Sequence, residues 1–365
     1  MSELPISTPK FYGRYIEFEE ISAILNPSKL GKKRIVLFGI GGSGKTQLAL
    51  QYVEKKKQLY KAVIWINAFT PEQATQSFTD AFHLVSRSWP AKDIPTPYTG
   101  NDKREFVLSR LRSTSYRNWL LVVDSVDDME SQNLVQLIPL SNHGSVIVTS
   151  TRQHASDILA PYGFQSMEID KLDDQSGKEL LLDKAELSSS FKGYDYARII
   201  TKELNGLPLA LEQAGILLRK KVVNLETFVE EYRIHYNALV GYLPKAGEVQ
   251  HDKTRSMHAI LNMLHAYVEH ESPTASAIIR LLAIVGPSQV PISVLLDVAK
   301  FSFPELLDDS EFRSLQESSR AHTIFRLHLT LLEDVCLVKI RPASDKSPES
   351  VLLHRAIFST WTRNY

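Results

Sequence analysis

The chain has 365 residues, of which 43% are hydrophobic and 23% charged, a composition typical of a globular protein with two or three domains. Its formal net charge of zero argues against non-specific binding to nucleic acid or to an anionic membrane. The single cysteine, Cys336, excludes an internal disulfide, and the N-terminus lacks the apolar core of a signal peptide. The apolar runs are too short to span a bilayer, so we expect a cytoplasmic protein.

The first strand predicted in chain order, at residues 35–38, leads directly into a glycine-rich segment that ends in Lys45 and Thr46. This segment matches the phosphate-binding loop G-x-x-x-x-G-K-[ST], with Gly39 and Gly44 at its two fixed positions. Glycine lets backbone amides approach a polyphosphate, and a helix beginning at Lys45 would add the positive end of its dipole. We expect Lys45 to reach the β- and γ-phosphates and Thr46 to ligate Mg²⁺. A plain glycine turn is the alternative, but the pattern predicts binding of a nucleoside di- or triphosphate.

Further short apolar runs alternate with amphipathic segments up to about residue 172. They predict strands at 62–66, 119–123, 145–149 and, more weakly, 165–169. Runs of this length are typical of parallel strands that are covered on both faces, so the sequence predicts a doubly wound α/β sheet. Residues 86–100 hold three prolines and are predicted to form a loop.

Asp124 ends the third predicted strand, where a P-loop ATPase needs an acid to hold the Mg²⁺ shell. Ser125 follows it, at the place where many such ATPases have a second acid that polarises the attacking water, and serine is a poor general base. Asp127 is a candidate substitute, although its place relative to the strand end is open. The sequence therefore predicts slow hydrolysis, or none without a partner.

The strand predicted at 145–149 delivers a charged residue, Arg152, to the C-terminal edge of the sheet. Ligands of open α/β sheets bind at that edge. We expect Arg152 to reach the γ-phosphate and so to distinguish a triphosphate from a diphosphate. The alternative is a surface arginine at the start of a loop.

From Leu172 onward the apolar spacing becomes helical, and it predicts helices at 177–185, 194–204, 209–221, 225–242, 256–269, 274–285, 292–299 and 322–334. The short polar segment 245–253 is expected to mark a domain boundary. Two predicted strands, 335–341 and 350–354, follow the last helix, and helices followed by a small hairpin are what a winged-helix domain requires. The cationic run 219–221 is expected to be a solvated helix face or helix end rather than a binding patch.

Taken in order, these motifs resemble the NB-ARC family of STAND-class ATPases, which are the nucleotide switches of plant disease-resistance receptors, animal apoptosome proteins and many fungal receptors. Residues 11–17 resemble the family's N-terminal G-R-x-x-E motif, and residues 39–49 resemble its P-loop. Residues 120–128 resemble its Walker B strand, and 145–152 its sensor strand. Residues 206–210, Gly-Leu-Pro-Leu-Ala, are its G-L-P-L-A signature, and the wording of the motifs is closer to fungal members than to plant ones.

The resemblance implies a P-loop nucleotide-binding domain over residues 1–172, a helical domain over 173–248 and a winged-helix domain over 249–365. It implies that the N-terminal motif cups the adenine base, that Pro208 packs against the base or sugar, and that His354 touches the β-phosphate of ADP. The residues implied to bind the nucleotide are Phe11, Tyr12, Arg14, Gly39, Gly41, Gly42, Ser43, Gly44, Lys45, Thr46, Gln47, Arg152, Pro208 and His354.

Catalytic roles are implied for Lys45, Asp124 and Asp127, and Thr46 with Asp124 would hold Mg²⁺. One motif departs from the family, which usually closes its winged helix with Met-His-Asp. Here Leu353 and Arg355 flank the histidine, so the acid that would orient the imidazole or pin the domain contact is lost. His354 is still expected to read the β-phosphate, with a surface histidine after a strand as the alternative.

These implications favour a signalling switch of the innate-immunity or programmed-cell-death type. ADP would hold the chain closed, and exchange for ATP would swing the winged helix out and allow assembly into a homo-oligomer. The competing interpretation is a catalytically silent scaffold or adaptor, which Ser125 and Arg355 favour and which the intact Lys45, Thr46 and Asp124 oppose. DNA binding is a third, weaker interpretation, because from residue 251 onward 12 Lys and Arg stand against 13 Asp and Glu.

Overall fold

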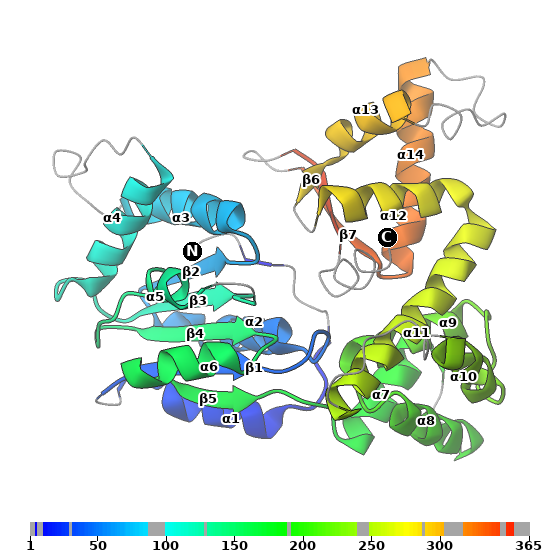
Figure 1. The fold of residues 1–365 in the computed structure, drawn as a ribbon, viewed down its shortest axis with the longest axis horizontal. Coiled ribbons are helices and arrows are strands. Elements are labelled where there is room, and N and C mark those ends of the chain that lie inside the picture. The colour runs from blue at the N-terminus through cyan, green and yellow to red at the C-terminus, as the bar shows by residue number, and fades with distance from the viewer. Residues whose placement is uncertain are drawn as a thin grey trace. The chain divides into compact units, whose positions relative to one another are not determined.

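The computed structural model describes residues 4–5, 10–28, 31–86, 99–127, 130–187, 191–238, 248–286, 289–302, 317–343 and 348–353. The chain divides into two compact units, Met1–Ser176 and Gly177–Tyr365. The first contains a five-stranded sheet and the second a three-stranded one (Figure 1). Among the described residues, no helix is both long enough and apolar enough to cross a membrane.

The first unit is built on five parallel strands in the order β2-β3-β4-β1-β5. Their bounds are Lys33–Phe38 (β1), Ala62–Asn67 (β2), Trp119–Asp124 (β3), Ser145–Ser150 (β4) and Gln165–Glu168 (β5). The prediction of a parallel α/β sheet is therefore confirmed. β1 begins two residues before the predicted start, because Lys33 and Arg34 are buried despite their charge, at 8% and 3% exposure.

Helices cover both faces of this sheet (Figure 1). They are α1 (Tyr15–Ile24), α2 (Lys45–Lys56), α3 (Pro71–Ser86), α4 (Gly100–Arg112), α5 (Ser131–Val135) and α6 (His154–Leu159), with 3-10 turns at Lys57–Leu59 and Ala160–Tyr162. Side chains alternate along each strand, so Val36 packs with α3, α4, α5 and α6, while Ile35 and Leu37 pack with α1 and α2. Most of the loop predicted at 86–100 lies outside the described residues.

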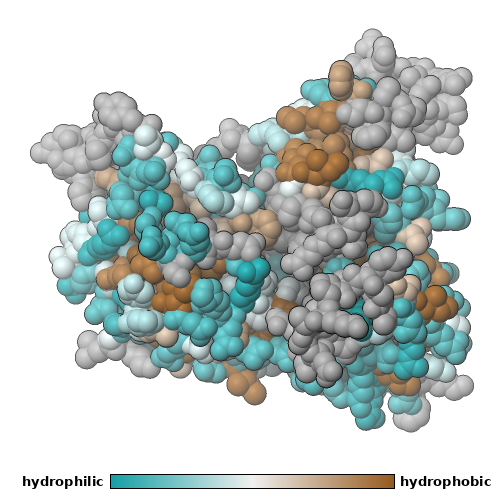
Figure 2. Space-filling model, in the orientation of Figure 1, coloured by the Kyte–Doolittle hydropathy of each residue, from teal (hydrophilic) through white to brown (hydrophobic). Residues whose placement is uncertain are grey.

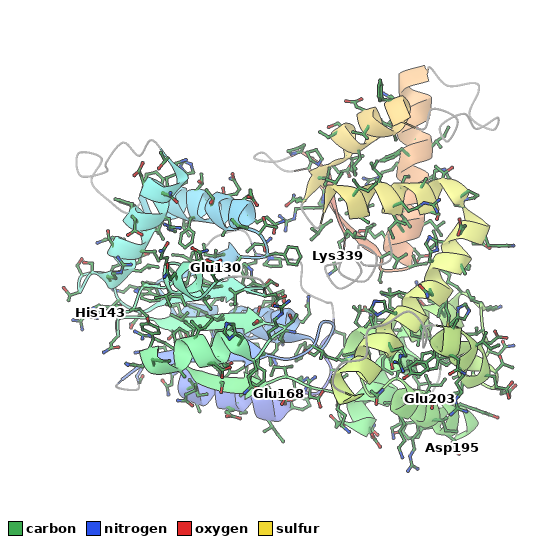
Figure 3. All side chains as sticks on the ribbon, in the orientation of Figure 1. Glu130, His143, Glu168, Asp195, Glu203 and Lys339 are labelled. Atoms are coloured by element: carbon green, nitrogen blue, oxygen red, sulfur yellow. The ribbon has the colours of Figure 1, made fainter. Side chains whose placement is uncertain are left out.

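The amino edge of the sheet is closed by tight packing around Trp119. This side chain is fully buried and donates its indole N–H to the Leu111 carbonyl at 3.0 Å. A Cβ on Gly144 would lie 2.1 Å from the indole ring, so only glycine fits beside it. In Figure 3, His143 marks this amino edge, and Glu168, at the end of β5, marks the carboxyl edge.

The second unit begins as a set of packed helices. They are α7 (Asp174–Lys184, whose first turn starts in the first unit), α8 (Phe191–Glu203), α9 (Pro208–Arg219), α10 (Phe228–Ala238) and α11 (Glu248–Glu271). All five correspond to predicted helices. α11 begins at Glu248, eight residues before the predicted helix start at 256, and so includes most of the segment 245–253; the domain boundary expected there stays a prediction. A polar helical turn carries no apolar period, so the pattern gave no sign of it.

Three more helices and a small antiparallel sheet complete the second unit. They are α12 (Pro273–Val285), α13 (Ile292–Ser302), α14 (Glu317–Asp334), β6 (Val290–Pro291), β7 (Val338–Arg341) and β8 (Ser350–Leu353), with the strand order β6-β8-β7. These are the elements that the winged-helix prediction required, and the assignment itself stays a prediction. Figure 2 shows hydrophobic surface over α13, where Val294, Val298 and Phe301 are exposed.

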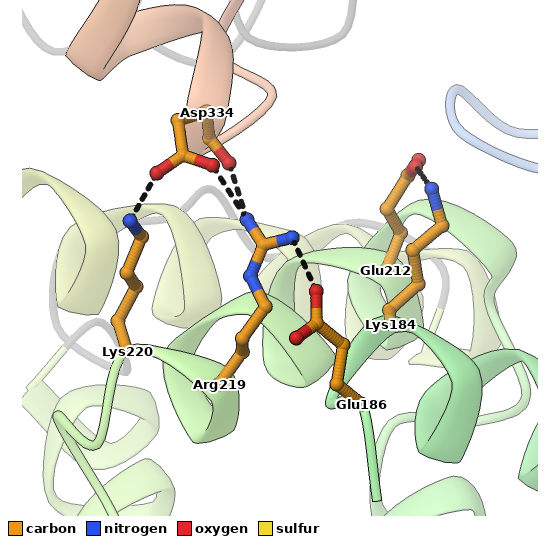
Figure 4. A network of polar contacts seen from close by, with 6 residues as sticks. All are labelled: Lys184, Glu186, Glu212, Arg219, Lys220 and Asp334. Atoms are coloured by element: carbon orange, nitrogen blue, oxygen red, sulfur yellow. Dashed lines mark hydrogen bonds and ion pairs between the residues drawn. The ribbon is translucent and has the colours of Figure 1, made fainter.

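Two cations of the run 219–221 are paired rather than simply solvated (Figure 4). Arg219, at the end of α9, donates to the main-chain carbonyl of Asp334 at 2.7 Å and to its carboxylate at 2.9 Å. Lys220 donates to the second carboxylate oxygen of Asp334. The Arg219 guanidinium also forms an ion pair with Glu186, with 3.4 Å between Nη1 and Oε1. These contacts connect α9 to the end of α14 inside the second unit.

Candidate functional site

The glycine-rich loop connects β1 to α2 in a backbone conformation that its glycines make possible. Gly39, Gly42 and Gly44 have φ angles of +141°, +82° and +93°, a region that residues with a Cβ rarely adopt. A Cβ on Gly39 would also lie 2.3 Å from the Ile169 carbonyl oxygen, whereas a Cβ on Gly41 would meet nothing within 4 Å. The loop therefore depends on particular glycines, and it leads into the N-terminus of α2.

Lys45, the first residue of α2, is folded into this loop. Its ammonium donates to the carbonyls of Gly39 at 2.7 Å and Ile40 at 2.8 Å, and the side chain is almost fully buried. Burial lowers the pKa of Lys45 to about 8, while the negative charges of Asp127 and Asp124 act in the opposite direction. The loop thus holds a buried cation whose charged form the carboxylates of Asp127 and Asp124 favour.

Asp124 and Thr46 meet although they are far apart in sequence. Asp124 is fully buried at the end of β3, and its Oδ1 accepts from the Thr46 hydroxyl at 2.8 Å. The same oxygen accepts from the Thr149 hydroxyl at 2.6 Å. β4 lies between β1 and β3, which places Thr149, near the end of β4, between the glycine-rich loop and Asp124. Two hydroxyls and one carboxylate therefore converge at the carboxyl edge of the sheet.

Thr149 was missed by sequence reasoning, which singled out only Arg152 at the end of that strand. A hydroxyl residue near the end of a strand that neighbours β3 would have been a candidate. The sequence, however, does not reveal which strands are neighbours. Thr149 also accepts a hydrogen bond from the Ser125 amide at 2.9 Å. This bond holds Ser125 in a left-handed conformation with φ +66°.

The structure places Asp127, whose position the sequence left open. Its carboxylate accepts from the Ser150 hydroxyl at 3.2 Å and from the Thr151 amide at 2.5 Å, so it is bound to the end of β4. It is also close enough to Lys45 to affect the pKa of that ammonium. Asp128 lies outside the described residues.

The N-terminal motif reaches the loop through Arg14. This side chain donates to the Ser43 carbonyl at 3.1 Å, to the Asp170 carbonyl, and to Glu17 at 2.8 Å. Tyr12 is buried and Phe11 half-buried beside it. The structure thus brings the N-terminal motif, the glycine-rich loop and Asp124 to one edge of the first unit.

Four other predicted site residues can be assigned to an element or segment of the chain. Gln47 lies in the first turn of α2, and Arg152 is exposed just after β4, with its amide donating to the Ser150 hydroxyl at 3.1 Å. Pro208 is the first residue of α9 and belongs to the second unit. His354 follows β8 and lies outside the described residues. The contacts that the resemblance implies for these four residues stay predictions.

No protein-family profile matches the chain. Over 318 residues, 80% of its length, it is 23% identical to a nucleotide-binding leucine-rich repeat (NLR)-like protein of Hyaloscypha variabilis, of which it spans 31%. Its fold is similar to the crystal structure of a Signal Transduction ATPase with Numerous Domains (STAND) protein with a tetratricopeptide repeat sensor from Pyrococcus horikoshii. That match has a TM-score of 0.54 and 14% identity, and it covers 97% of this chain and 43% of the archaeal one.

These two findings confirm the resemblance that the motifs indicated. In sequence the chain is similar to an NLR-like protein, and in fold it is similar to a STAND ATPase. The parallel sheet with its glycine-rich loop is a P-loop NTPase arrangement. The chain spans 31% of the NLR-like protein and 43% of the STAND protein, which is less than half of either.

Proposed function

We propose that this chain is an adenine-nucleotide switch of the NLR and STAND type. The observation that carries the proposal is the meeting of Lys45, Thr46 and Asp124 at the carboxyl edge of the sheet, with Thr46 bonded to Asp124 at 2.8 Å. Three groups that a nucleotide–Mg²⁺ complex needs are thereby placed together by two separate strands. The NLR-like and STAND relatives support an adenine nucleotide as the ligand.

The residues present fit a polyphosphate. The loop offers left-handed glycines, an N-terminus of the twelve-residue helix α2, and a cation in Lys45. In the proposed complex the Lys45 ammonium exchanges the Gly39 and Ile40 carbonyls for phosphate oxygens, which carry more negative charge. The N-terminal motif is held against the loop by Arg14, and its backbone at Phe11 and Tyr12 is proposed to cup the adenine.

The same edge fits Mg²⁺. A hydroxyl and a carboxylate are oxygen donors, and Mg²⁺ in nucleotide sites is held by few protein oxygens together with phosphate and water. Thr46 and Asp124 would hold the ion, and Thr149 would keep the Asp124 carboxylate in place. When bound, Mg²⁺ would neutralise phosphate charge at this edge.

Hydrolysis is proposed to be slow or absent without a partner. Ser125 occupies the position after Asp124, and its hydroxyl is a poor general base at neutral pH. Asp127 already accepts from Ser150 and Thr151, which ties its carboxylate to β4. The site is therefore better suited to holding a nucleotide than to turning it over.

The switch we propose has a closed ADP state and an open ATP state. Arg152 would respond to the γ-phosphate, while Pro208 and His354 would contact ADP from a helical domain and a winged-helix domain. A nucleotide can shift such an equilibrium only through contacts that differ between the states, and these residues would supply them. Opening is proposed to permit self-assembly in a cytoplasmic signalling pathway of the immunity or cell-death type.

A second candidate function is a scaffold that binds nucleotide only structurally or not at all. The specific observation that favours it is the absence of a second acid directly after Asp124, where Ser125 stands. The replacement of the family's closing acid by Arg355 points the same way. Nucleotide content and exchange distinguish this scaffold from a switch.

The test is to purify the chain, denature it and identify the released nucleotide by chromatography, and then to measure exchange of bound ADP for added ATP. The proposal predicts stoichiometric ADP or, in an empty preparation, tight uptake of added ADP and ATP. Lys45→Arg should weaken retention, and Lys55→Arg, on the exposed side of the same helix, serves as the matched control. A chain that is empty and ignores added nucleotide would exclude the switch and leave the scaffold.

A further inference from the structure

Two consecutive residues of the N-terminal motif have left-handed backbone: Gly13 with φ +60° and Arg14 with φ +62°. Glycine adopts this conformation freely, but arginine adopts it rarely and with some loss of stability. Non-glycine residues in such conformations cluster at functional positions, where neighbouring contacts hold them. The contacts made by Arg14 therefore indicate what its backbone conformation achieves.

The Arg14 guanidinium joins two segments that are distant in sequence. It is buried, and one of its terminal nitrogens donates to the Ser43 carbonyl at 3.1 Å and to the Asp170 carbonyl. These partners lie 29 and 156 residues away. The other terminal nitrogen binds Glu17 at 2.8 Å, which fixes the plane of the guanidinium.

The two carbonyls that accept from Arg14 belong to two different segments. Ser43 lies in the glycine-rich loop, two residues before Lys45. Asp170 opens the segment 170–176, which ends the first unit at Ser176. Within that segment Asp173 accepts from the Ser176 amide at 2.9 Å and hydroxyl at 2.6 Å, and so fixes the start of α7.

Gly13 adds a second contact between the motif and this segment. A Cβ at Gly13 would lie 2.7 Å from the Ser176 hydroxyl oxygen and 3.3 Å from an Asp173 carboxylate oxygen. The turn formed by Gly13 and Arg14 is therefore packed directly on the residues that begin α7. The motif touches the loop on one side and segment 170–176 on the other.

We propose that Arg14 is a positioning residue that couples the conformation of the glycine-rich loop to segment 170–176, and thereby to the start of the second unit. The inference rests on the proposed nucleotide function, because a ligand must move or order the loop. When the Ser43 carbonyl shifts, the shared guanidinium nitrogen shifts with it and changes its bond to Asp170. A purely adenine-binding role for the motif would need only its backbone and would not require this bridge.

The test is hydrogen–deuterium exchange over residues 170–176, with and without saturating ADP, in the full chain. The wild-type segment is expected to exchange at least about three-fold more slowly when ADP is bound, as expected when opening of a segment becomes less favourable. Arg14→Gly removes the bridge and relieves the left-handed strain, so this variant is expected to fold. It should bind ADP about 10-fold more weakly, in line with loss of hydrogen bonds from a charged group, and show no nucleotide-dependent change in the segment.

Two further variants separate coupling from general stability. Arg14→Lys keeps the charge, but an ammonium lacks the planar guanidinium, so partial recovery of affinity without recovery of the exchange response is expected. Arg34→Lys is the matched control: Arg34 is also buried and donates to the Tyr162 and Ser141 carbonyls at 2.7 and 2.8 Å, at the opposite edge of the sheet. It should lose stability and keep the wild-type exchange response.

The outcomes distinguish this inference from the function on which it rests. If the wild-type chain binds no nucleotide, both are overturned. If it binds ADP and Arg14→Gly has wild-type affinity and an unchanged exchange response, only the coupling role of Arg14 is overturned. An equal loss of the response in Arg34→Lys would likewise assign the effect to general destabilisation.

Discussion

The two edges of the five-stranded sheet are both lined by buried polar groups, yet they are bonded differently. At the amino edge, Arg34 donates to the main-chain carbonyls of Tyr162 and Ser141, and Trp119 donates to that of Leu111. At the carboxyl edge, Thr46 and Thr149 donate to the carboxylate of Asp124. The bonds of Arg34 and Trp119 hold segments of the fold together. At the carboxyl edge, the hydroxyls of Thr46 and Thr149 and the Lys45 ammonium could give up their present acceptors when a ligand binds. Substitutions at the two edges should therefore separate stability from binding.

The largest effects are expected from two glycines, one at each edge. Gly39→Ala places a Cβ 2.3 Å from the Ile169 carbonyl oxygen, and Gly144→Ala places one 2.1 Å from the Trp119 ring. Each should lower the free energy of unfolding by about 3 kcal/mol, as strained or overpacked sites do. Urea denaturation measures this loss, and ADP titration at a temperature where both variants are folded measures binding.

Only Gly39→Ala should also lose nucleotide affinity, because only it deforms the phosphate loop. Gly41→Ala, whose Cβ would meet nothing within 4 Å, is the control within the loop for the stability loss. Wild-type affinity in Gly39→Ala, or a large loss of affinity in folded Gly144→Ala, would remove the distinction between the edges.

A smaller effect is expected when one hydroxyl of the cluster is removed. Thr149→Val deletes the donor to Asp124 and the acceptor for the Ser125 amide with little change in shape. The unsatisfied buried groups should lower affinity for ATP with Mg²⁺ about 10-fold, equivalent to about 1.4 kcal/mol. Thr201→Val is the matched control, since Thr201 is buried and donates to the Ala197 carbonyl at 2.7 Å in α8 of the second unit. It should reduce stability alone; equal effects on ATP affinity in both variants would contradict the prediction.

The pH dependence of binding should follow Lys45. Its pKa of about 8 in the folded chain lies below the ordinary value of 10.5, because burial disfavours the charged form. The cation therefore opposes folding below pH 8, and this penalty is relieved as the pH rises from 8 toward 10.5. Nucleotide affinity should move in the opposite direction, falling about 10-fold between pH 7 and pH 9 as the ammonium is lost.

Titrations of ADP across this range test the assignment. The residual binding of Lys45→Arg should be nearly independent of pH, because a guanidinium stays charged. Affinity that is constant in the wild-type chain up to pH 9.5 would show that Lys45 does not titrate as the nucleotide binds.

The smallest effect is expected in the second unit, at the polar network of Figure 4. Asp334 is 43% exposed, and exposed ion pairs contribute little, so Asp334→Asn should lower the free energy of unfolding by about 1 kcal/mol or less. Glu203→Gln, which breaks the exposed pair with Arg233, is the control and should behave alike. Thermal unfolding at low and high salt measures both, and a loss near 3 kcal/mol at Asp334 would show that this network holds the second unit together.

The sequence predicted the parallel sheet well because its strands are buried on both faces and read as unbroken apolar runs. The sequence did not predict those parts of strands and helices that are formed by polar or charged residues. Lys33 and Arg34 begin β1 although they are charged. Their side chains are buried, and the Arg34 guanidinium donates hydrogen bonds to two main-chain carbonyls. Likewise the first two turns of α11 are polar and have no apolar period, so the helix was predicted to begin only at residue 256.

The candidate site shows a similar division. The glycine-rich loop and Asp124 were predictable because each belongs to a pattern of neighbouring residues. The loop is marked by the spacing of its glycines, and Asp124 by the apolar strand that precedes it. Thr149 and the contacts of Arg14 depend on strand order and on partners up to 156 residues away, which no local pattern contains. The position of Asp127 depends on the left-handed backbone at Ser125, and a serine in the sequence does not predict that conformation.

The most direct test of the central claim is an equilibrium titration of ADP and ATP with Mg²⁺ into the purified, nucleotide-free chain and its Lys45→Ala variant. We expect one site per wild-type chain, and a loss of about 100-fold or more in Lys45→Ala, in line with removal of a buried charge from a phosphate contact. The amino-edge variant Arg34→Lys should keep the wild-type affinity. A wild-type chain that binds neither nucleotide, or a Lys45→Ala chain that binds as tightly as wild type, would contradict the account.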